Sequence, residues 1–478
     1  MTGASPALRL ALGVAAAMAP PPPAFPAETP LGHVIEGLRA ARDSAVLALD
    51  DAGRPIGILT EQDIARRVAF RLPEEAPLSA AISAPLITCA PDAGLWRAVA
   101  LMRAHRLRHL PVVDAAGRCI GMLHRADVLA AVSGRMLQHL DALAGDDAAV
   151  KAAQAGLATA LLHEGIEAPA LVRLVSEINL DLHRRVLARA LAEGPPPPIG
   201  FTLLVMGSAG RGESLLRPDQ DNGLILEPYP DASHDQLDAW FRPMTERLNA
   251  GLAAAGFPLC PGGIMARNPL WRKTRAQWEA QFALWARRRS GAALLFADIA
   301  FDFRGVARIG AVEGDPAAAL RAAIAPILAA HPALLGALAA QDQRLRVGLT
   351  LWGGFADDEP GAGTRTDLKL HGLMPLVAAT RLLALQHGVA ETGTAERLAA
   401  LAERGVVSHG PGLQRAFTLL LDALLRQQLA DHAAGQSPGN LVDTAALPKP
   451  VRAELREALR EIRRFAKACF AGFTGELW

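Results

Sequence analysis

Residues 207–221 decide the fold, and they read Gly207-Ser208-Ala209-Gly210-Arg211-Gly212-Glu213-Ser214-Leu215-Leu216-Arg217-Pro218-Asp219-Gln220-Asp221. Apolar runs flank this stretch at 201–206 and 222–226, so a strand is expected at each end. A Gly-Ser turn between a strand and a helix presents backbone N–H groups and a hydroxyl to phosphate. We therefore predict that Gly207 and Ser208 bind phosphate, with Arg211 adding positive charge.

Two carboxylates close this stretch. Asp219 and Asp221 are two residues apart, so an extended chain places both on one side. Neighbouring carboxylates repel each other unless a cation lies between them, and hard oxygen ligands select Mg²⁺. Two such ions would stabilise the attacking and leaving oxygens of an in-line displacement at an α-phosphate. The pattern therefore predicts metal-dependent nucleotidyl transfer.

A third carboxylate is expected from a later segment. Residues 300–306 alternate Phe with charged residues, which predicts a strand with Asp302 and Arg304 on one face. Asp302 is our candidate for a third catalytic and metal-binding acid, and Asp298 is the alternative. A salt bridge between Asp302 and Arg304 is the structural alternative, and the sequence leaves it open.

A glycine-containing loop at 260–272 precedes a tryptophan-rich helix. Asn268 and Arg272 could reach a base or a triphosphate from this loop, so both are secondary candidates for nucleotide binding. Trp278 and Trp285 are spaced about two helical turns apart, and we expect both in the hydrophobic core.

An internal repeat lies upstream. Residues 53–59, GRPIGIL, are echoed by residues 117–123, GRCIGML, and each copy reads as helix, strand, turn, strand, helix. This pattern resembles the CBS domain, whose tandem pairs form a cleft that commonly accepts adenine nucleotides. The resemblance implies AMP, ADP or ATP as a regulatory ligand.

The same resemblance implies ligand-binding roles for Thr60 with Asp63 in the first copy and for Asp127 in the second. A carboxylate can accept hydrogen bonds from two ribose hydroxyls, and a nearby helix N-terminus favours phosphate. His124 replaces the hydroxyl residue in the second copy, which weakens that site. Helix capping by these aspartates is an equally good explanation.

The motifs at 207–226, 260–272 and 301–306 occur in an order that resembles the nucleotidyltransferase superfamily of DNA polymerase β. They are most similar to a bacterial family of nucleotidyltransferases fused to CBS domains, related to the enzymes that uridylylate PII and adenylylate glutamine synthetase. This resemblance implies phosphate binding by Gly207 and Ser208, and metal binding by Asp219, Asp221 and Asp302. Ala209 and Ser214 depart from the family pattern, because relatives often carry a carboxylate and an amide there.

From residue 316 onward the apolar spacing is helical, which predicts a bundle. In the resembling family this region is a substrate-binding domain, and Asp367-Leu368-Lys369 with Gly372 and Pro375 matches it. Asp367 and Lys369 are also explained as a helix start and a surface charge.

These observations predict a multidomain α/β plus α protein: a tandem CBS α+β module, a helical connector, a nucleotidyltransferase-type α/β domain with a mixed sheet, and a C-terminal helical bundle. The expected boundaries are an N-terminal segment at 1–26, CBS repeats at 27–79 and 80–135, a connector at 136–200, a transferase domain at 201–315 and a helical domain at 316–478.

Composition limits the partners. A net charge of +1 over 478 residues gives no field that attracts nucleic acid or an anionic membrane. Four cysteines lie far apart without a C-x-x-C pair, which argues against a zinc site or a disulfide framework and favours the cytoplasm. The short apolar run from Leu10 to Ala19 is read as a packing helix in preference to a signal peptide, and no stretch is long enough to span a membrane.

The sequence therefore predicts a Mg²⁺-dependent transferase that moves a nucleoside monophosphate from ATP or UTP to a hydroxyl of a protein or small molecule, under CBS control. The acceptor is unknown, with a signalling protein as one possibility, and the CBS resemblance implies a homodimer. A non-catalytic nucleotide sensor in signal transduction is the alternative. A polynucleotide polymerase is disfavoured by the neutral charge.

Overall fold

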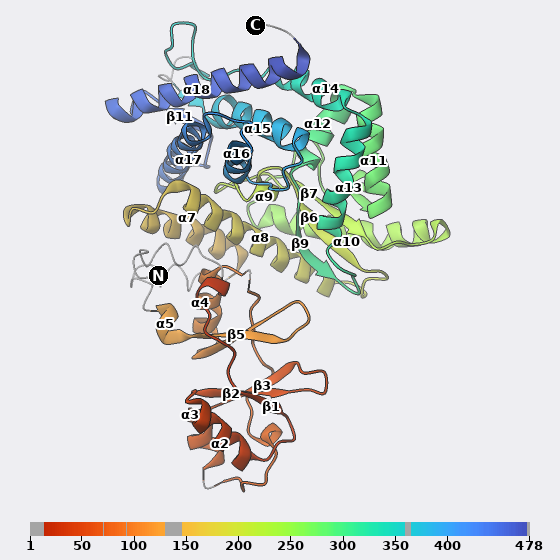
Figure 1. The fold of residues 1–478 in the computed structure, drawn as a ribbon, viewed down its shortest axis with the longest axis vertical. Coiled ribbons are helices and arrows are strands. Elements are labelled where there is room, and N and C mark those ends of the chain that lie inside the picture. The colour runs from red at the N-terminus through yellow and green to blue at the C-terminus, as the bar shows by residue number, and fades with distance from the viewer. Residues whose placement is uncertain (1–13, 70, 92, 130–145, 359–364, 476–478) are drawn as a thin grey trace. The chain divides into compact units, whose positions relative to one another are not determined.

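The computed structural model describes residues 14–69, 71–91, 93–129, 146–358 and 365–475 (Figure 1). The chain divides into two compact units, with the boundary between Ile166 and Glu167. Each unit is described by itself.

The first unit contains the two predicted repeats. Each repeat has an antiparallel strand pair with an irregular register near the end of its first strand, at Ala48/Leu49 and at Val112/Val113. Gly53 and Gly117 turn these pairs with φ of 75° and 78°, a conformation that favours glycine. The elements are β1 (Ala24–Pro26), α2 (Leu31–Ala41), β2 (Ala45–Leu49), β3 (Pro55–Thr60), α3 (Glu61–Asp63), α4 (Leu95–Ala104), β4 (His109–Val113), β5 (Cys119–His124) and α5 (Arg125–Leu129).

Several predicted boundaries of this unit differ from the structure. β1 pairs in parallel with β2, so the sheet of the first repeat begins before residue 27. Of the predicted N-terminal helix, residues 10–13 lie outside the described residues. Val14–Ala16 form a short 3₁₀ turn whose first N–H donates to the Ala93 carbonyl, with an N···O distance of 2.8 Å. The predicted connector is divided, because α7 (Asp147–His163) belongs to the first unit and α8 (Ala168–Ala192) to the second.

The second unit is built on a four-stranded mixed sheet in the order β8-β7-β6-β9. β7 and β8 run parallel, and the other neighbours run antiparallel. The strands are β6 (Phe201–Val205), β7 (Asn222–Leu226), β8 (Arg272–Thr274) and β9 (Arg304–Ile309), and the helices around them are α9 (Gly207–Arg211), α10 (His234–Ala254), α11 (Arg275–Arg288) and α12 (Gly291–Ala300).

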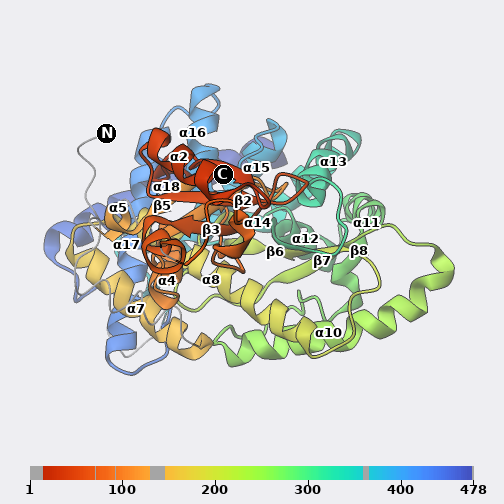
Figure 2. The same cartoon turned by 90° about the horizontal axis from the view of Figure 1, so that it is seen from below.

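Continuous burial explains the central strands. Every residue of β6 and β7 is buried, which matches their unbroken apolar sequences. α8 and α10 pack along each other beside this sheet (Figure 2). Trp271, Trp278 and Trp285 lie together in the core, and the Trp278 indole N–H donates to the Leu224 carbonyl at 3.0 Å. The prediction that Trp278 and Trp285 are core residues is confirmed.

The predicted strand at 300–306 is wrong in its first half. α12 continues to Ala300, and β9 begins only at Arg304, so Asp302 lies in the connecting turn. Helix-forming Ala and Leu residues fill 291–300 and extend the helix. Phe301 and Phe303 are both buried, as the strand prediction required. Here a helix end followed by a turn, and not a strand, buries these alternate residues.

The C-terminal region is helical, as predicted. α18 packs against α14, α15 and α17 (Figure 1), and one core cluster is continuous from Leu204 in the sheet to Phe470 in α18. The elements are α13 (Pro316–Ala330), α14 (Ala333–Asp342), β10 (Arg365–Asp367), the π-helical segment η6 (Lys369–Leu373), α15 (Met374–Gln386), α16 (Thr394–Glu403), α17 (Gly410–Ala433), β11 (Leu441–Asp443) and α18 (Lys449–Thr474).

Within the described residues, no single helix is both long enough and apolar enough to cross a membrane. α13 and α14 reach that length together, but they bend by 96° where they meet.

Candidate active site

The corner between β6 and α9 requires glycine at position 207. Gly207 has φ of +58°, and a Cβ added there would lie 3.0 Å from Oδ2 of Asp221. The Met206 N–H donates to the Asp221 carbonyl at 2.9 Å, which joins the corner to the start of β7. α9 has only five residues, so its macrodipole is small. Phosphate binding here would depend on the first free N–H groups of the turn and on the Ser208 hydroxyl.

The two aspartates face away from their buried neighbours. Gln220 donates to the Phe257 carbonyl at 3.0 Å, and Oδ1 of Asn222 accepts the Ala266 N–H at 2.8 Å. Asn249 in α10 hydrogen-bonds to both amide side chains. Because side chains alternate along an extended chain, Asp219 and Asp221 lie on the opposite side from these anchors. The sequence prediction missed the positioning role of these amide side chains. The alternation of acidic and amide residues from 219 to 222 could have indicated it.

The electrostatics of Asp221 reflect its burial and the charge of the neighbouring Asp219. The pKa of Asp221 is raised to about 6, mainly by burial and also by the charge of Asp219, whereas a hydrogen bond with Cys260 and the charge of Lys369 lower it. A cation between Asp219 and Asp221 would remove the repulsion. Within the described part of the chain, no three His, Cys, Asp or Glu side chains are grouped so that they could hold a metal ion.

Asp302 is not available as a third metal ligand beside Asp219 and Asp221. It is fully buried, and its oxygens accept hydrogen bonds from three guanidinium groups, those of Arg211 (2.8 Å), Arg381 (2.9 Å) and Arg397 (2.7 Å). Burial opposes ionisation, but the three guanidinium groups hold the pKa of Asp302 well below its usual range. The predicted role of Asp302 as a third metal ligand does not agree with this arrangement, because both of its oxygens are already taken. Arg304, its predicted partner, pairs instead with Glu177 at 2.9 Å.

The same ion pairs join the helical domain to the corner between β6 and α9. Arg211 lies in α9, whereas Arg381 lies in α15 and Arg397 in α16. Arg381 also pairs with Asp298, the alternative third acid. Glu213 accepts from Arg211 at 2.6 Å and from the Thr394 N–H at 2.5 Å. We refer to Arg211, Glu213, Asp298, Asp302, Arg381 and Arg397 as the buried ion-pair cluster.

Three side chains that were predicted to contact the nucleotide form hydrogen bonds or ion pairs with other protein groups instead. Arg211 gives its guanidinium to Glu213 and Asp302, as described above. Arg272 is buried, pairs with Asp238 and donates to the Ala266 and Arg267 carbonyls, at 2.9 Å each.

Asn268 caps a short 3₁₀ turn by accepting the Leu270 N–H at 3.0 Å, and its amide donates to the Gly263 carbonyl at 3.2 Å. The bonds of Arg272 and Asn268 hold the loop, and they replace the predicted contacts to a base or triphosphate.

A small pocket of about 40 Å³ opens beside Ser208. Arg211 and Glu213 line it from the corner, and Lys369 and Gln428 line it from the helical domain. The sequence left two interpretations of Lys369 open: part of a family motif, or a charged surface residue. In the structure, Lys369 lies beside the corner between β6 and α9.

A cleft of about 740 Å³ lies between the two repeats of the first unit. Thr60 and Asp63 line it, and they also form a capping box, with 2.7 Å between the Thr60 hydroxyl and Oδ2 of Asp63. Ser44 of the first repeat hydrogen-bonds to His109 of the second at 2.8 Å. Asp127 lies in α5, and its side chain is outside the described residues.

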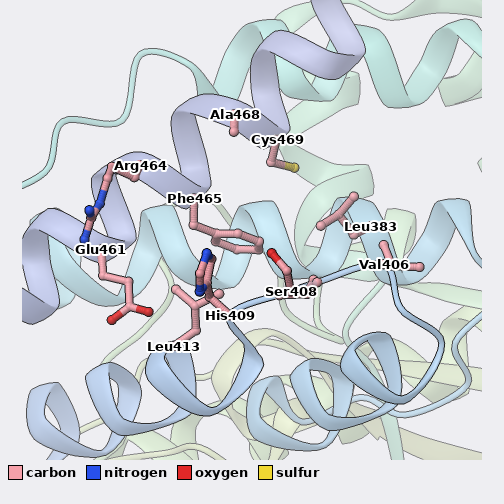
Figure 3. Close-up of a pocket in the computed structure, with 11 residues that line it drawn as sticks. Leu383, Val406, Ser408, His409, Leu413, Glu461, Arg464, Phe465, Ala468 and Cys469 are labelled. Atoms are coloured by element: carbon pink, nitrogen blue, oxygen red, sulfur yellow. The ribbon is translucent and has the colours of Figure 1, made fainter.

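The helical domain has a second cavity, of about 520 Å³, which shares no lining residue with the pocket beside Ser208. Figure 3 shows the rings of Phe465 and His409 lying close together in it, with Leu383 and Cys469 on the apolar side and Glu461 nearby. Burial raises the pKa of the Cys469 thiol to about 12. Apolar atoms make up most of the lining of this cavity, although charged side chains also contribute to it.

A mixed sheet with a Gly-Ser corner and paired aspartates, joined to a helical bundle and preceded by a CBS pair, defines a CBS-linked protein of the nucleotidyltransferase class. Comparison with known families agrees. Residues 14–69 and 78–134 match the CBS domain, residues 152–292 match "Putative nucleotidyltransferase DUF294", and residues 332–471 match "Putative nucleotidyltransferase substrate binding domain". The chain belongs to this family, which confirms the resemblance seen in its motifs.

Individual relatives match only part of the chain. An uncharacterized protein of Methanopyrus kandleri is 34% identical over 87 residues, which is 18% of this chain and 44% of that protein. The chain thus spans less than half the length of this curated relative. Among solved structures, a CBS domain protein from Pyrobaculum aerophilum in complex with AMP is 26% identical, with 24% of this chain and 89% of that chain covered and a TM-score of 0.23. An uncharacterized conserved protein from Pyrococcus horikoshii is 21% identical, with 26% and 92% covered and a TM-score of 0.24.

Proposed function

We propose that this protein is a Mg²⁺-dependent nucleotidyltransferase that moves a nucleoside monophosphate from ATP or UTP to a hydroxyl of a protein or small molecule. The observation that carries the proposal is the placement of Asp219 and Asp221 at the Gly207-Ser208 corner, where a Cβ on residue 207 would meet Oδ2 of Asp221. Family membership supports the reaction class.

The donor set of this corner fits Mg²⁺ without a third carboxylate. Mg²⁺ keeps several water ligands and is commonly held by one or two carboxylates together with substrate phosphates. Asp221 has an oxygen next to residue 207, and Asp219 is close enough to influence the charge of Asp221, so the corner offers two carboxylates as donors. Bound Mg²⁺ would supply charge stabilisation at the reacting phosphate.

The protein residues would position the substrate. We assign the triphosphate contacts to the Gly207 backbone and the Ser208 hydroxyl, and the metal contacts to Asp219 and Asp221. Gln220 and Asn222 hold this geometry through Asn249. Asp302 and Arg211 become positioning residues in the buried ion-pair cluster, since they fix α9 against α15 and α16.

The test is transfer of label from α-³²P-ATP and α-³²P-UTP, with Mg²⁺, into the proteins and small molecules of a host lysate. Wild type should transfer label from one nucleotide, and Asp219→Asn and Asp221→Asn should each reduce transfer by at least about a hundredfold, as expected for lost charge stabilisation. Asp235→Asn is the matched control, because Asp235 is an exposed residue in the first turn of α10. An equal loss in the control would contradict the assignment.

A second candidate function is a non-catalytic nucleotide sensor. It is favoured by one observation, that Asp302 is committed to three arginines and leaves the pair of acids without a third. Nucleotide binding without label transfer, even with AMP or ATP added for the CBS cleft, would establish the sensor in place of the enzyme.

We also propose that an adenine nucleotide binds the cleft between the CBS repeats and regulates the second unit. Three arginines line this cleft, Arg106, Arg108 and Arg125, and they offer positive charge to phosphate near Thr60 and Asp63. Titrating AMP, ADP and ATP against the transfer rate tests the coupling, and an unchanged rate for all three contradicts it. The proposed homodimer is tested by light scattering during size-exclusion chromatography.

A further inference from the structure

Lys369 belongs to the helical domain, yet it borders the phosphate corner. It begins η6, separated from the end of β10 by one residue, and it lines the same small pocket as Ser208. β10 pairs with β11, and Oδ1 of Asp367 accepts the Leu370 N–H at 2.7 Å, so the turn that carries Lys369 is fixed. The lysine is therefore presented to the corner by an ordered backbone. π-helical turns such as η6 often occur at functional positions.

The charge of Lys369 is available. It forms no ion pair with any described residue, and it lies close enough to Asp221 to influence that carboxylate. Arg211 and Arg272, the two predicted phosphate-binding cations, are both occupied by carboxylates and carbonyls. Lys369 therefore remains as a cation at the corner without a carboxylate partner among the described residues.

Space also favours an anion at this position. The pocket holds about 40 Å³, which suits one phosphate oxygen or a single water and excludes a nucleoside. Ser208 offers a hydroxyl on one wall, and Lys369 offers an ammonium on another. The rest of the lining is mainly apolar, and the Glu213 carboxylate on it is paired with Arg211. A hydroxyl and an ammonium that line one small space are suitable donors for a charged phosphate oxygen.

We propose that Lys369 binds the β- or γ-phosphate of the nucleoside triphosphate. Asp219 and Asp221 would hold the Mg²⁺ that contacts the α-phosphate. This inference rests on the proposed nucleotidyl transfer, and it gives the helical domain a part in holding the nucleotide in addition to the acceptor. The domain is held in place for this role by Gln428, which accepts the Leu216 N–H at 3.1 Å, and by Thr394, which donates to Glu213.

The experiment is calorimetric titration of the full-length protein with inorganic tripolyphosphate in the presence of Mg²⁺. Tripolyphosphate carries the proposed contact and lacks a nucleoside. Lys369→Ala should bind it about tenfold or more weakly, because a charge-assisted hydrogen bond is lost, whereas Lys369→Arg should stay within about threefold. Lys467→Ala, an exposed lysine of α18, is the control and should bind as wild type does. The CBS cleft is the same in all four proteins, so the difference reports on Lys369.

Two results would overturn the inference: Lys369→Ala binding tripolyphosphate as tightly as wild type, or wild type failing to bind it. Thermal unfolding of each variant shows whether a loss comes from misfolding, and Lys369→Arg then gives a second, milder substitution. Failure of the proposed function has a different signature. In that case tripolyphosphate binding still depends on Lys369, but wild type transfers no label.

Discussion

Arg397 in α16 donates to Asp302 in the turn before β9, with 2.7 Å between Nη1 and Oδ1. These residues lie far apart in the sequence, and both are buried. Their contact ties the helical domain to the sheet through charge as well as through the shared apolar core. Asp302, which the sequence predicted to be catalytic, therefore links two parts of the second unit, and its loss should lower the free energy of unfolding.

Asp302→Asn should destabilise the second unit strongly. Removing the charge leaves three buried guanidinium groups without their common partner, and breaking a buried ion pair typically costs about 3–5 kcal/mol. Urea unfolding followed by tryptophan fluorescence measures this, because Trp271, Trp278 and Trp285 lie in the same core. Asp235→Asn should stay within about 0.5 kcal/mol of wild type. Wild-type stability with abolished transfer would instead restore Asp302 as a catalytic acid.

Local patterns predicted the elements around the site well. β7 begins at Asn222, directly after Asp221, as its apolar run indicates, and the repeat of GRPIGIL identified both CBS strand pairs. The error at Asp302 also has a local cause. Phe301 and Phe303 are both buried, so a helix end followed by a turn produced the alternation of a strand.

The buried ion-pair cluster could not be predicted in the same way. Arg381 and Arg397 meet Asp302 only because α15 and α16 fold back onto α12 and β9, and no periodicity records such a pairing. The sequence singled out Lys369 as part of a family motif, but its approach to Ser208 could not be predicted, because that approach depends on the packing of the helical domain.

Gly207→Ala tests the geometry of the corner. Alanine at φ of +58° is strained by about 1–2 kcal/mol, and its Cβ would also press on Oδ2 of Asp221. Gly388 has a similar φ of +61° with nothing within 4 Å, so Gly388→Ala carries the strain without the contact. Both variants should lose comparable stability in urea. Only Gly207→Ala should also lose the stabilisation that Mg²⁺ gives in thermal unfolding, and it should transfer label at least about tenfold more slowly.

If Gly388→Ala loses transfer to the same extent, backbone strain alone explains the effect. The proposed contact between residue 207 and Asp221 would then have no special role.

Thr60→Ala separates capping from ligand binding in the CBS cleft. Thr60 caps α3 in a capping box with Asp63, and Thr274 caps α11 in the same way with Gln277. Each Thr→Ala change should cost about 1 kcal/mol of stability. Only Thr60→Ala should weaken AMP binding, by about tenfold, because only Thr60 lines the cleft. Calorimetric AMP titration of both variants checks this, and equal affinities would leave Thr60 with the capping role alone.

Asp342 should make the second unit less stable as the pH rises. The pKa of Asp342 is raised to about 7, mainly by burial and also by the charge of Asp298. Its folded-state pKa is above the unfolded value of about 4, so the protonated form favours folding. This contribution is complete below about pH 4 and is lost as the pH rises through about 7, by at most about 1.4 kcal/mol per pH unit. The Asp342→Asn variant cannot ionise at this position, so it does not lose this contribution. The difference in unfolding free energy, variant minus wild type, should therefore increase from pH 5 to pH 8. Urea titrations across that range measure the difference, and parallel curves for the two proteins would show that Asp342 already ionises freely in the folded state.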